Sequence, residues 1–338
     1  MISSNKCVEK TDCLWRSVFL LLLPAQDLLM AIQHITAPQY APPEVLTEDS
    51  TAEAMAFLSV DIPLNLFQLS WLENYGIDSP RKADAFVFLG VRTTRGRLAG
   101  VALLVGRSLL LVHSPEAGAA EALGRWVRGQ EVHLDHLVSD TPSVDAFWRG
   151  YAHADAHLED PPAPLQAQTH RAQMLYTLER HRWNYCNTLP ERAAAGVHPR
   201  LARLDEIDAV FLASVRMHRE ETNIDPLEDD PDAFRRHVAH RISNGRCYVH
   251  FDAHRRLLFK AELSAHSRFG AQVSGVYTDP ICRQKGIATA ALFDICKQLF
   301  EGGARRVTLY VNDDNEAAHR VYRKVGFVPH APYQTIFV

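Results

Sequence analysis

The sequence has no long apolar run, no metal-binding motif and no excess of charge of one sign. Its 338 residues carry 36 Lys and Arg against 40 Asp and Glu, a formal net charge of −4. Without a basic excess, the composition does not point to a nucleic-acid partner. The chain is 47% hydrophobic and 22% charged, near the globular average, which excludes wholesale disorder. At roughly 150 residues per domain, its length predicts about two domains.

Cysteine and histidine are present, but no metal-binding motif contains them. The six cysteines form no C-x-x-C pair, so we expect free, mostly buried thiols in a reducing compartment and a cytoplasmic protein. No H-E-x-x-H occurs among the 17 histidines, and no motif completes a ligand set around pairs such as His133 and His136. We therefore predict no metal site and interpret the histidines as solvated.

The longest membrane-like feature lies near the N-terminus. Residues 18–23 are apolar and end at Pro24, which is too short to cross roughly 30 Å of hydrocarbon, so no membrane association is expected. Three interpretations stay open: a poor signal peptide, an extension ahead of a true start at Met30, or an ordinary amphipathic helix. We treat residues 1–45 as an N-terminal extension, with disorder as one interpretation, and leave them out of the fold.

Residues 46–180 are predicted to form a first α/β domain. A helical pattern over 50–75 should split at Pro63. Short apolar runs predict strands, a helix follows, and a last apolar run predicts the final strand of this half. The expected strands are 85–91, 98–105, 109–113 and 173–178, and the expected helix is 116–129. Because residues 180–196 are polar and lack periodicity, we predict a linker at 181–196.

Residues 197–338 begin the same kind of pattern again. A short strand, two helices and three strands precede an alternation of helix and strand to the end of the chain. The expected strands include 201–204, 246–251, 256–264 and 271–278, and the first two helices are 205–221 and 231–244. This order predicts an α/β (α+β) fold with a mixed, mostly antiparallel sheet flanked by helices.

One strand–loop–helix unit could bind an anion. Strand residues 276–278 lead through Pro280 into a loop with Arg283, Gly286 and Ala288 in the pattern R-x-x-G-x-A, and a helix follows. Small residues let a ligand approach the backbone N–H groups at the helix N-terminus, which suits a pyrophosphate. The loop is neither a Walker motif nor a dinucleotide G-x-G-x-x-G. The alternative is a tight turn with small packing residues.

A second segment, close to the first in the sequence, places an amide and a phenol on one face of a helix. After an alternating strand at 307–311, Asn315 can cap a helix that Gly326 ends. Asn315 and Tyr322 are seven residues apart and so share one helical face. The alternatives are that Asn315 only caps the helix and that Tyr322 only packs in the core.

These two segments resemble the GNAT superfamily of acetyl-CoA-dependent N-acyltransferases. The family pattern continues as N-x-x-A-x-x-x-Y-x-x-x-G-F, and Asn315, Ala318, Tyr322, Gly326 and Phe327 fill it. One departure is Thr278, where an aliphatic residue is usual, but that position acts through its backbone. The close match covers about 60 residues, and the order of elements extends it back to about residue 197.

The resemblance assigns roles to individual residues. Main-chain groups of 276–278 would pair with the pantetheine arm, N–H groups of 284–289 would hold the pyrophosphate, and Tyr322 would be the general acid for the departing thiolate. An unperturbed phenol is protonated at neutral pH, as that role requires. The residues assigned to acetyl-CoA are Val276, Tyr277, Thr278, Arg283, Gln284, Lys285, Gly286, Ile287, Ala288, Thr289 and Asn315.

An amine nucleophile also needs a base. Glu262 lies among apolar neighbours in a strand, where a carboxylate could have a raised pKa and face the substrate cleft, or could form a cross-strand ion pair. His266, Glu220 and Glu221 are alternatives. Glu220 and Glu221 end a helix in a region that often covers the acceptor pocket of GNAT folds, so we assign them to binding the substrate amino group, with solvated acids as the alternative.

The first half carries none of these motifs. Residues 60–67 and the strands after residue 85 resemble a poorly characterised domain that precedes some GNAT domains. That resemblance implies two tandem GNAT-like domains, the first degenerate and without a cofactor site. The expected activity is acetyl transfer from acetyl-CoA to a primary amine by direct attack in a ternary complex. The acceptor could be a small molecule or a protein. Alternatives are a non-catalytic acyl-CoA sensor and a protein-lysine acetyltransferase whose first half docks the target.

Overall fold

One continuous sheet runs through both halves of the protein. The computed structural model describes residues 39–77, 86–106, 108–153, 163–186, 193–222, 225–228 and 230–338. Within these ranges the sheet has 12 strands in the order β1-β2-β3-β4-β5-β12-β6-β11-β10-β9-β8-β7. The strands are β1 (Glu44–Val45), β2 (Phe86–Arg92), β3 (Leu98–Val105), β4 (Leu109–His113), β5 (His136–Asp140), β6 (Thr169–Glu179), β7 (Arg200–Leu201), β8 (Cys247–Phe251), β9 (Leu257–Ser267), β10 (Gly270–Thr278), β11 (Arg306–Asn312) and β12 (Val328–Phe337). The mixed, mostly antiparallel sheet is therefore as predicted.

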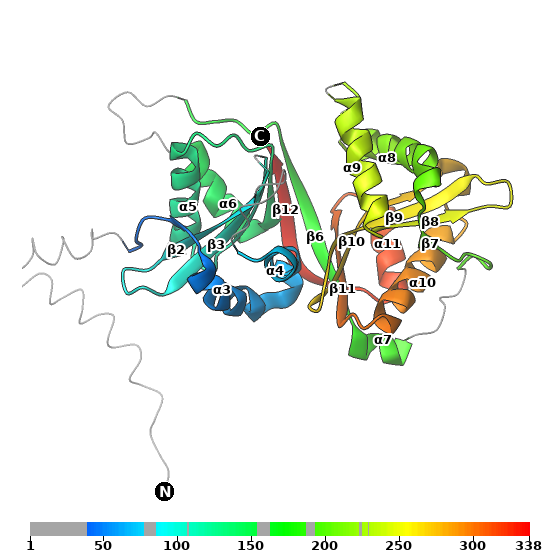
Figure 1. Ribbon diagram of the computed structural model, residues 1–338, viewed down its shortest axis with the longest axis horizontal. Helices are drawn as coiled ribbons and strands as arrows, with labels where there is room; N and C mark the ends of the chain where they lie inside the picture. The colour runs from blue at the N-terminus through cyan, green and yellow to red at the C-terminus, as the bar shows by residue number, and fades with distance from the viewer. Residues whose placement is uncertain are drawn as a thin grey trace, which may run out of the picture.

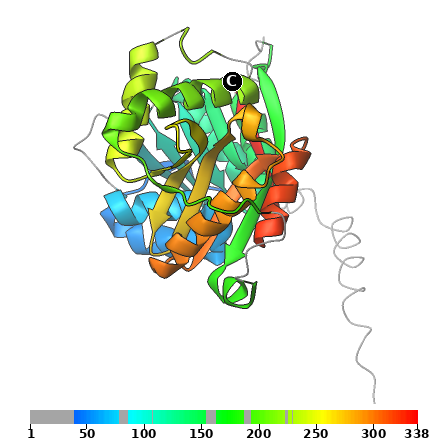
Figure 2. The same cartoon turned by 90° about the vertical axis from the view of Figure 1, so that its right-hand side faces the viewer.

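Helices cover both faces of the sheet (Figures 1 and 2). They are α3 (Thr51–Leu58), α4 (Ile62–Tyr75), α5 (Ala117–Gly129), α6 (Thr141–Ala152), α7 (Arg180–Cys186), α8 (Ile207–Thr222), α9 (Pro231–Ser243), α10 (Ile287–Glu301) and α11 (Glu316–Val325). Helices α3, α4, α8 and α9 pack on one face, and α5, α6, α10 and α11 pack on the other. In β11 and β6, for example, Tyr310 and Leu175 contact Leu64 of α4, whereas Leu309 and Tyr176 belong to the core under α10 and α11.

The two halves of the sheet have the same pattern of strand pairing on either side of its centre. Each half contributes antiparallel strands followed by one parallel pair, β4–β5 in the first half and β10–β11 in the second. The antiparallel pair β6–β12 lies at the centre, where β6 also pairs with β11, and β12 with β5. Equivalent strands therefore occupy equivalent places about the middle of the sheet, as an internal duplication of one fold requires.

The place of β6 differs from the prediction. The strand exists, but it lies between β12 and β11 and does not close the sheet of the first half. The strand next to β5 is instead β12, from the end of the chain. Local residue patterns determine whether a segment is extended, whereas the partner of a strand depends on distant residues, so the periodicity of 173–178 could not reveal this exchange.

Several predicted boundaries also change. Residues 39–45, assigned to the extension, belong to the sheet, because β1 pairs with β2 and Tyr40 bridges to Thr93. The predicted linker contains α7, whose Trp183 packs against Phe293 and Phe300 of α10 at ring-centroid distances of 4.7 and 5.4 Å. The predicted strand 201–204 is reduced to β7, because Glu206 accepts hydrogen bonds from Arg203 and Arg200 and a 3-10 turn begins at Leu204. The apolar run 18–23 lies outside the described residues.

The predicted split near Pro63 is confirmed. A 3-10 turn follows α3, and Asp61 then caps α4 by accepting a hydrogen bond from the backbone N–H of Leu64 at 3.1 Å. The run Glu48–Tyr75 is long and apolar enough to cross a membrane on composition alone. Its apolar side chains include Leu58 and Leu69, which are fully buried in the core against β2 and β3. Elsewhere Cys247, Cys282 and Cys296 are free and buried, as expected of thiols in a packed interior.

Because β6 and β12 join the halves, the protein should unfold as one cooperative unit. Leu175 of β6 is fully buried and packs against Leu64 of α4 and Tyr310 of β11. We expect Leu175→Ala to lower the free energy of unfolding by about 2–5 kcal/mol in a single urea transition. Leu212→Ala, at a side chain that is 55% exposed, is the control and should change it by about 0.5 kcal/mol or less. Two separate transitions, only one of them shifted, would contradict the shared sheet.

Candidate active site

Strands β10 and β11 separate after a short stretch of pairing. Their parallel register includes only Ala271 with Val307 and Gln272 with Thr308. Beyond these pairs, the register of β10 against β9 shifts at 272–273 and again between Ser274 and Tyr277. Gly275 lies in the second irregularity with φ of +56°, a conformation that glycine adopts without strain. The bulge frees the edge of β10 that faces β11, so backbone groups of 273–278 line an opening in the sheet.

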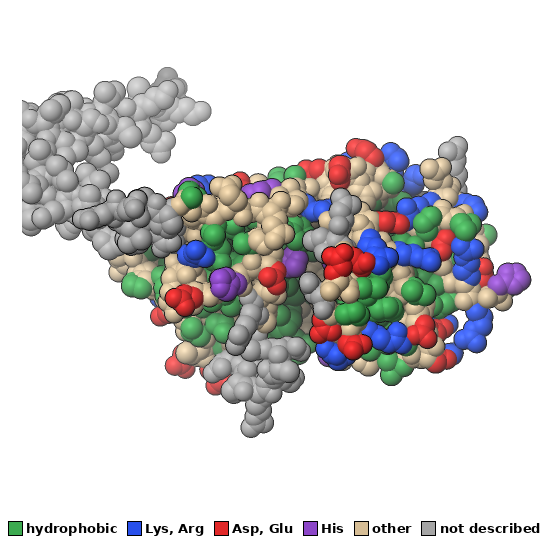
Figure 3. All heavy atoms as spheres, turned by 90° about the horizontal axis from the view of Figure 1, so that it is seen from above, with side chains coloured by type: hydrophobic (Ala, Val, Ile, Leu, Met, Phe, Trp, Pro, Cys, Tyr) green, Lys and Arg blue, Asp and Glu red, His purple; other side chains and the backbone are tan. Residues whose placement is uncertain are grey.

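A cavity of about 730 Å³ occupies this opening. Its walls come from α8, β10, the loop before α10, β11, α11 and one residue of β6. The surface seen from above in Figure 3 is hollowed between the two halves of the molecule. Of the residues predicted to hold acetyl-CoA, all but Lys285 line the cavity, and so do Tyr322, Glu220 and Glu221. The Lys285 side chain is exposed and does not line the cavity.

The loop before α10 presents unpaired backbone donors to the cavity. Gln284 and Gly286 both have left-handed φ values, of 62° and 79°, and Gly286 caps the helix. The N–H groups of residues 284–289 have no hydrogen-bond partner among the described residues, whereas the N–H of Ala290 already bonds to Gly286 O at 3.0 Å. Unpaired N–H groups at a helix N-terminus, with Arg283 beside them, form a site for a phosphate or pyrophosphate. Gln284 is a non-glycine residue in a conformation that is usually avoided, which is typical of functional loops.

Helix α11 brings Tyr322 to the opposite wall. Asn315 caps the helix by accepting from the N–H of Ala318 at 3.1 Å, and Gly326 ends it with φ of 108°. Asn315 thus caps the helix and also lines the cavity. The Tyr322 ring packs between Tyr176 and Phe327 and is 6% exposed. Burial raises the pKa of its phenol well above the usual value, and the charge of Glu221 adds to the effect. The phenol is therefore a proton donor at any physiological pH.

Glu262 is held in an ion pair rather than in the apolar setting that the sequence suggested. Its carboxylate lies 2.6 Å from Nζ of Lys260, which is fully buried, and 3.9 Å from Arg241. Burial alone would raise the pKa of the Glu262 carboxyl, but the two cations outweigh it and the pKa is lowered. Glu262 does not line the cavity directly. A Cβ on Gly275, a cavity residue, would lie only 3.2 Å from Glu262 Cδ, so this carboxylate lies directly beside a residue of the cavity wall.

The two acids at the end of α8 differ in their partners. Glu220 pairs with Arg283 of the anion-binding loop at 2.6 Å. Glu221 is exposed to the cavity, yet protein atoms surround it. This partial burial raises its pKa, although Lys260 and Arg171 act in the opposite direction. His266, the other proposed base, lies outside the cavity wall.

Sequence reasoning missed the residues that β6 and β11 bring to this cavity. Gln173 of β6 lines it, donates to Asn312 Oδ1 at 2.8 Å and accepts from Thr335 Oγ at 2.8 Å. Tyr310 also lines the cavity, with its ring 5.1 Å from that of Tyr333. The first half therefore contributes a wall residue to the site of the second half. No local signal marks Gln173, because its role depends on the exchange of β6.

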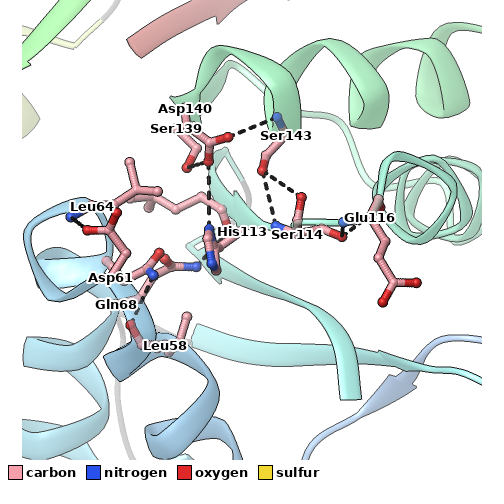
Figure 4. Close-up of polar contacts among 12 residues, drawn as sticks. Leu58, Asp61, Leu64, Gln68, His113, Ser114, Glu116, Ser139, Asp140 and Ser143 are labelled. Atoms are coloured by element: carbon pink, nitrogen blue, oxygen red, sulfur yellow. Dashed lines mark hydrogen bonds and ion pairs between the residues drawn. The ribbon is translucent and has the colours of Figure 1, made fainter. Parts of the chain in front are cut away.

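The equivalent position in the first half is closed (Figure 4). Where β4 and β5 diverge, the hydroxyl of Ser143 accepts from Ser114 N–H at 3.1 Å and donates to Ser114 O at 3.2 Å. Gln68 of α4 donates to the carbonyl of Leu111 at 3.3 Å, and His113 lies 3.7 Å from Asp140. Only residues 114–116 connect β4 to α5, whereas residues 279–286 connect β10 to α10. The short connection leaves no loop of free N–H groups such as that before α10.

Comparisons with known proteins agree with this geometry. Residues 216–327 match the acetyltransferase (GNAT) family. A mycothiol acetyltransferase from Nocardioides sp. is 27% identical over 260 residues, which are 71% of this chain and 82% of that protein. The structure of a tandem GNAT protein from the clavulanic acid biosynthesis pathway covers 88% of this chain and 98% of its own, with a TM-score of 0.53 and 15% identity. A GCN5-related N-acetyltransferase from Sphaerobacter thermophilus covers 89% and 95%, with a TM-score of 0.53 and 12% identity. At such identities the two structures establish the fold alone.

The bulge at Gly275 should be intolerant of any side chain. In Gly275→Ala the new methyl group would contact Glu262 Cδ at 3.2 Å and Lys260 Nζ at 3.4 Å, with a left-handed φ. We expect a loss of about 1–3 kcal/mol in the free energy of unfolding, measured by urea denaturation. Gly129→Ala is the matched control, because a Cβ there meets no atom within 4 Å and φ is not positive. Equal effects of the two substitutions would contradict the strained bulge.

Proposed function

We propose that this chain, whose residues 216–327 match the acetyltransferase (GNAT) family, transfers an acetyl group from acetyl-CoA to a primary amine. One observation carries the proposal. The free edge of β10, the unpaired N–H groups of 284–289 and the Tyr322 phenol all meet in one cavity. An extended pantetheine arm would pair with the backbone of 276–278. Its pyrophosphate would lie on the N–H groups at the start of α10.

The chemistry is direct acyl transfer in a ternary complex. The amine nitrogen attacks the thioester carbonyl carbon, a C–N bond forms and the C–S bond breaks. Tyr322 gives its proton to the departing thiolate, so the thiol leaves neutral. An acceptor that enters as an ammonium ion loses one proton to a carboxylate before the nitrogen attacks. The second proton, lost after the C–N bond forms, returns the Tyr322 phenolate to the phenol. The raised pKa of Tyr322 keeps its proton in place until the thiolate appears.

We assign the base role to Glu262. Lys260 and Arg241 lower its pKa, so the carboxylate is ionised and able to accept a proton at neutral pH. The 2.6 Å contact with Lys260 fixes its orientation behind Gly275. Glu221 is the alternative base, because it lines the cavity and its pKa is raised.

A small-molecule acceptor is favoured over a protein. The relative from Nocardioides is named for mycothiol, a small molecule, which makes mycothiol-related amines the first acceptors to test. Helix α4 of the first half also lies over the second half, where Ser70 contacts Ser267 at 2.8 Å and Asn74 donates to His266 O at 3.0 Å. We propose that the first half binds no cofactor and instead shapes the acceptor side of the cavity through Gln173 of β6, with Leu64 of α4 packed behind Tyr310.

Tyr322→Phe tests the acid. Removing the hydroxyl should lower kcat about 10²- to 10⁴-fold, because the thiolate must then leave unprotonated. Acetyl-CoA binding, measured by calorimetry, should change little, since the ring still packs between Tyr176 and Phe327. Full turnover in this variant would eliminate the role. Binding of acetyl-CoA by the wild type without turnover on any amine would instead indicate an acyl-CoA sensor.

The pH dependence of kcat/KM distinguishes Glu262 from Glu221 as the base. A base with a lowered pKa stays ionised into more acid solution than free Glu. Once the ionisation of the acceptor amine itself is divided out, kcat/KM should therefore fall only below about pH 4.5. Glu262→Gln should reduce kcat about 100-fold or more, and Glu221→Gln about 10-fold or less. If the acid limb instead lies above about pH 4.5 and disappears in Glu221→Gln, the base is Glu221.

A further inference from the structure

Arg283 makes two contacts that turn it away from the neighbouring anion-binding N–H groups. Its Nη2 lies 2.6 Å from Glu220 Oε2 on α8, and its Nε donates to Thr278 O at 3.0 Å. The guanidinium carbon lies 5.8 Å from the centroid of the Tyr277 ring. All four residues line the cavity. Arg283 therefore lies across the edge of β10 and neutralises a carboxylate.

The same contacts compete with a pyrophosphate. The N–H groups of residues 284–289 have no partner among the described residues, and Arg283 directly precedes them. The Arg283 and Glu220 side chains are both 45% exposed, so their ion pair is worth about 1 kcal/mol or less. A guanidinium binds phosphate oxygens bidentately with charge-assisted hydrogen bonds, which are stronger. A pyrophosphate on the loop would therefore draw Arg283 away from Glu220.

Glu220 then becomes an unpaired carboxylate in the cavity wall. Within the described ranges, Arg283 is the ion-pair partner of Glu220, and no ion pair is found for the carboxylate of the neighbouring Glu221. Arg283 contacts Oε2 of Glu220 and partly neutralises the carboxylate, so a cationic group in the cavity would be attracted to Glu220 more strongly once Arg283 had moved. The ion pair thus couples the anion-binding loop to the acid at the end of α8.

We propose that Arg283 exchanges Glu220 for the pyrophosphate of CoA, and that the released Glu220 carboxylate binds the ammonium group of the acceptor. This inference rests on the proposed function and adds a binding site for the acceptor cation. By linkage, CoA and a cationic acceptor then raise each other's affinity by the same factor. The acceptor class that fits is a small molecule with an amine that is protonated at neutral pH.

Calorimetric titration of the full-length protein with CoA tests the exchange. Glu220→Gln removes the competitor of the pyrophosphate and should lower the Kd of CoA about 2- to 5-fold. Glu221→Gln is the matched control, because it removes a neighbouring negative charge that has no Arg283 partner. It should change the Kd less than Glu220→Gln does. In an Arg283→Met background, Glu220→Gln should have no larger effect than Glu221→Gln, because the ion pair is already absent.

A second titration tests the released carboxylate. Ethylammonium chloride, compared with sodium chloride at equal ionic strength, should lower the Kd of CoA for the wild type. The Kd of CoA should fall about twofold when the ethylammonium concentration equals the dissociation constant of ethylammonium from the CoA complex, if ethylammonium binds that complex alone. Glu220→Gln should abolish this effect, and Glu221→Gln should retain it.

The outcomes separate the inference from the proposed function. Equal effects of Glu220→Gln and Glu221→Gln on CoA binding, or an unchanged ethylammonium effect in Glu220→Gln, would overturn the exchange while CoA binding itself stands. A wild-type protein that binds no CoA would instead overturn the proposed function, and the exchange with it.

Discussion

The antiparallel pair β6–β12 is the constraint on which the rest of the molecule depends. Each strand joins the other half: β6 pairs with β11, and β12 pairs with β5. One face of β6 places Tyr176 in the core under α10 and α11, where its hydroxyl lies 2.9 Å from His319 Nδ1. The other face places Gln173 in the cavity. The candidate active site therefore belongs to the whole chain, although its motifs lie in one half.

The equivalent parallel pairs of strands, β4–β5 and β10–β11, have different surroundings in the two halves. In the second half, a bulge at Gly275 and the connection 279–286 hold β10 and β11 apart and leave backbone donors free. In the first half, hydrogen bonds instead join Ser114, directly after β4, to Ser143 of α6, which follows β5. Backbone groups in a protein interior must find partners. The first half supplies them from its own side chains, whereas the second half leaves them for a ligand.

The sequence predicted what depends on neighbouring residues. The R-x-x-G-x-A loop, the Asn315 cap, the Gly326 stop and the split near Pro63 are local features, and the fold class follows from the order of such elements. It did not predict what depends on distant partners. The exchange of β6, the wall residue Gln173 and the buried Lys260 beside Glu262 require strand pairings that no local period encodes. The helix α7 was missed because residues 180–196 show no hydrophobic periodicity, although Trp183 packs against α10.

The position of β12 also governs how the protein comes to be folded during synthesis. Residues 328–337 leave the ribosome after every other strand of the sheet, yet they must enter the middle of the sheet between β5 and β6. Until then the β5 edge of the first half has no neighbour, and β6 has its partner on one side only. Exposed strand edges of this kind invite pairing with other chains. The sheet thus stays open at its centre until β12 has been made, so the step that completes both halves is a late pairing between strands far apart in the sequence.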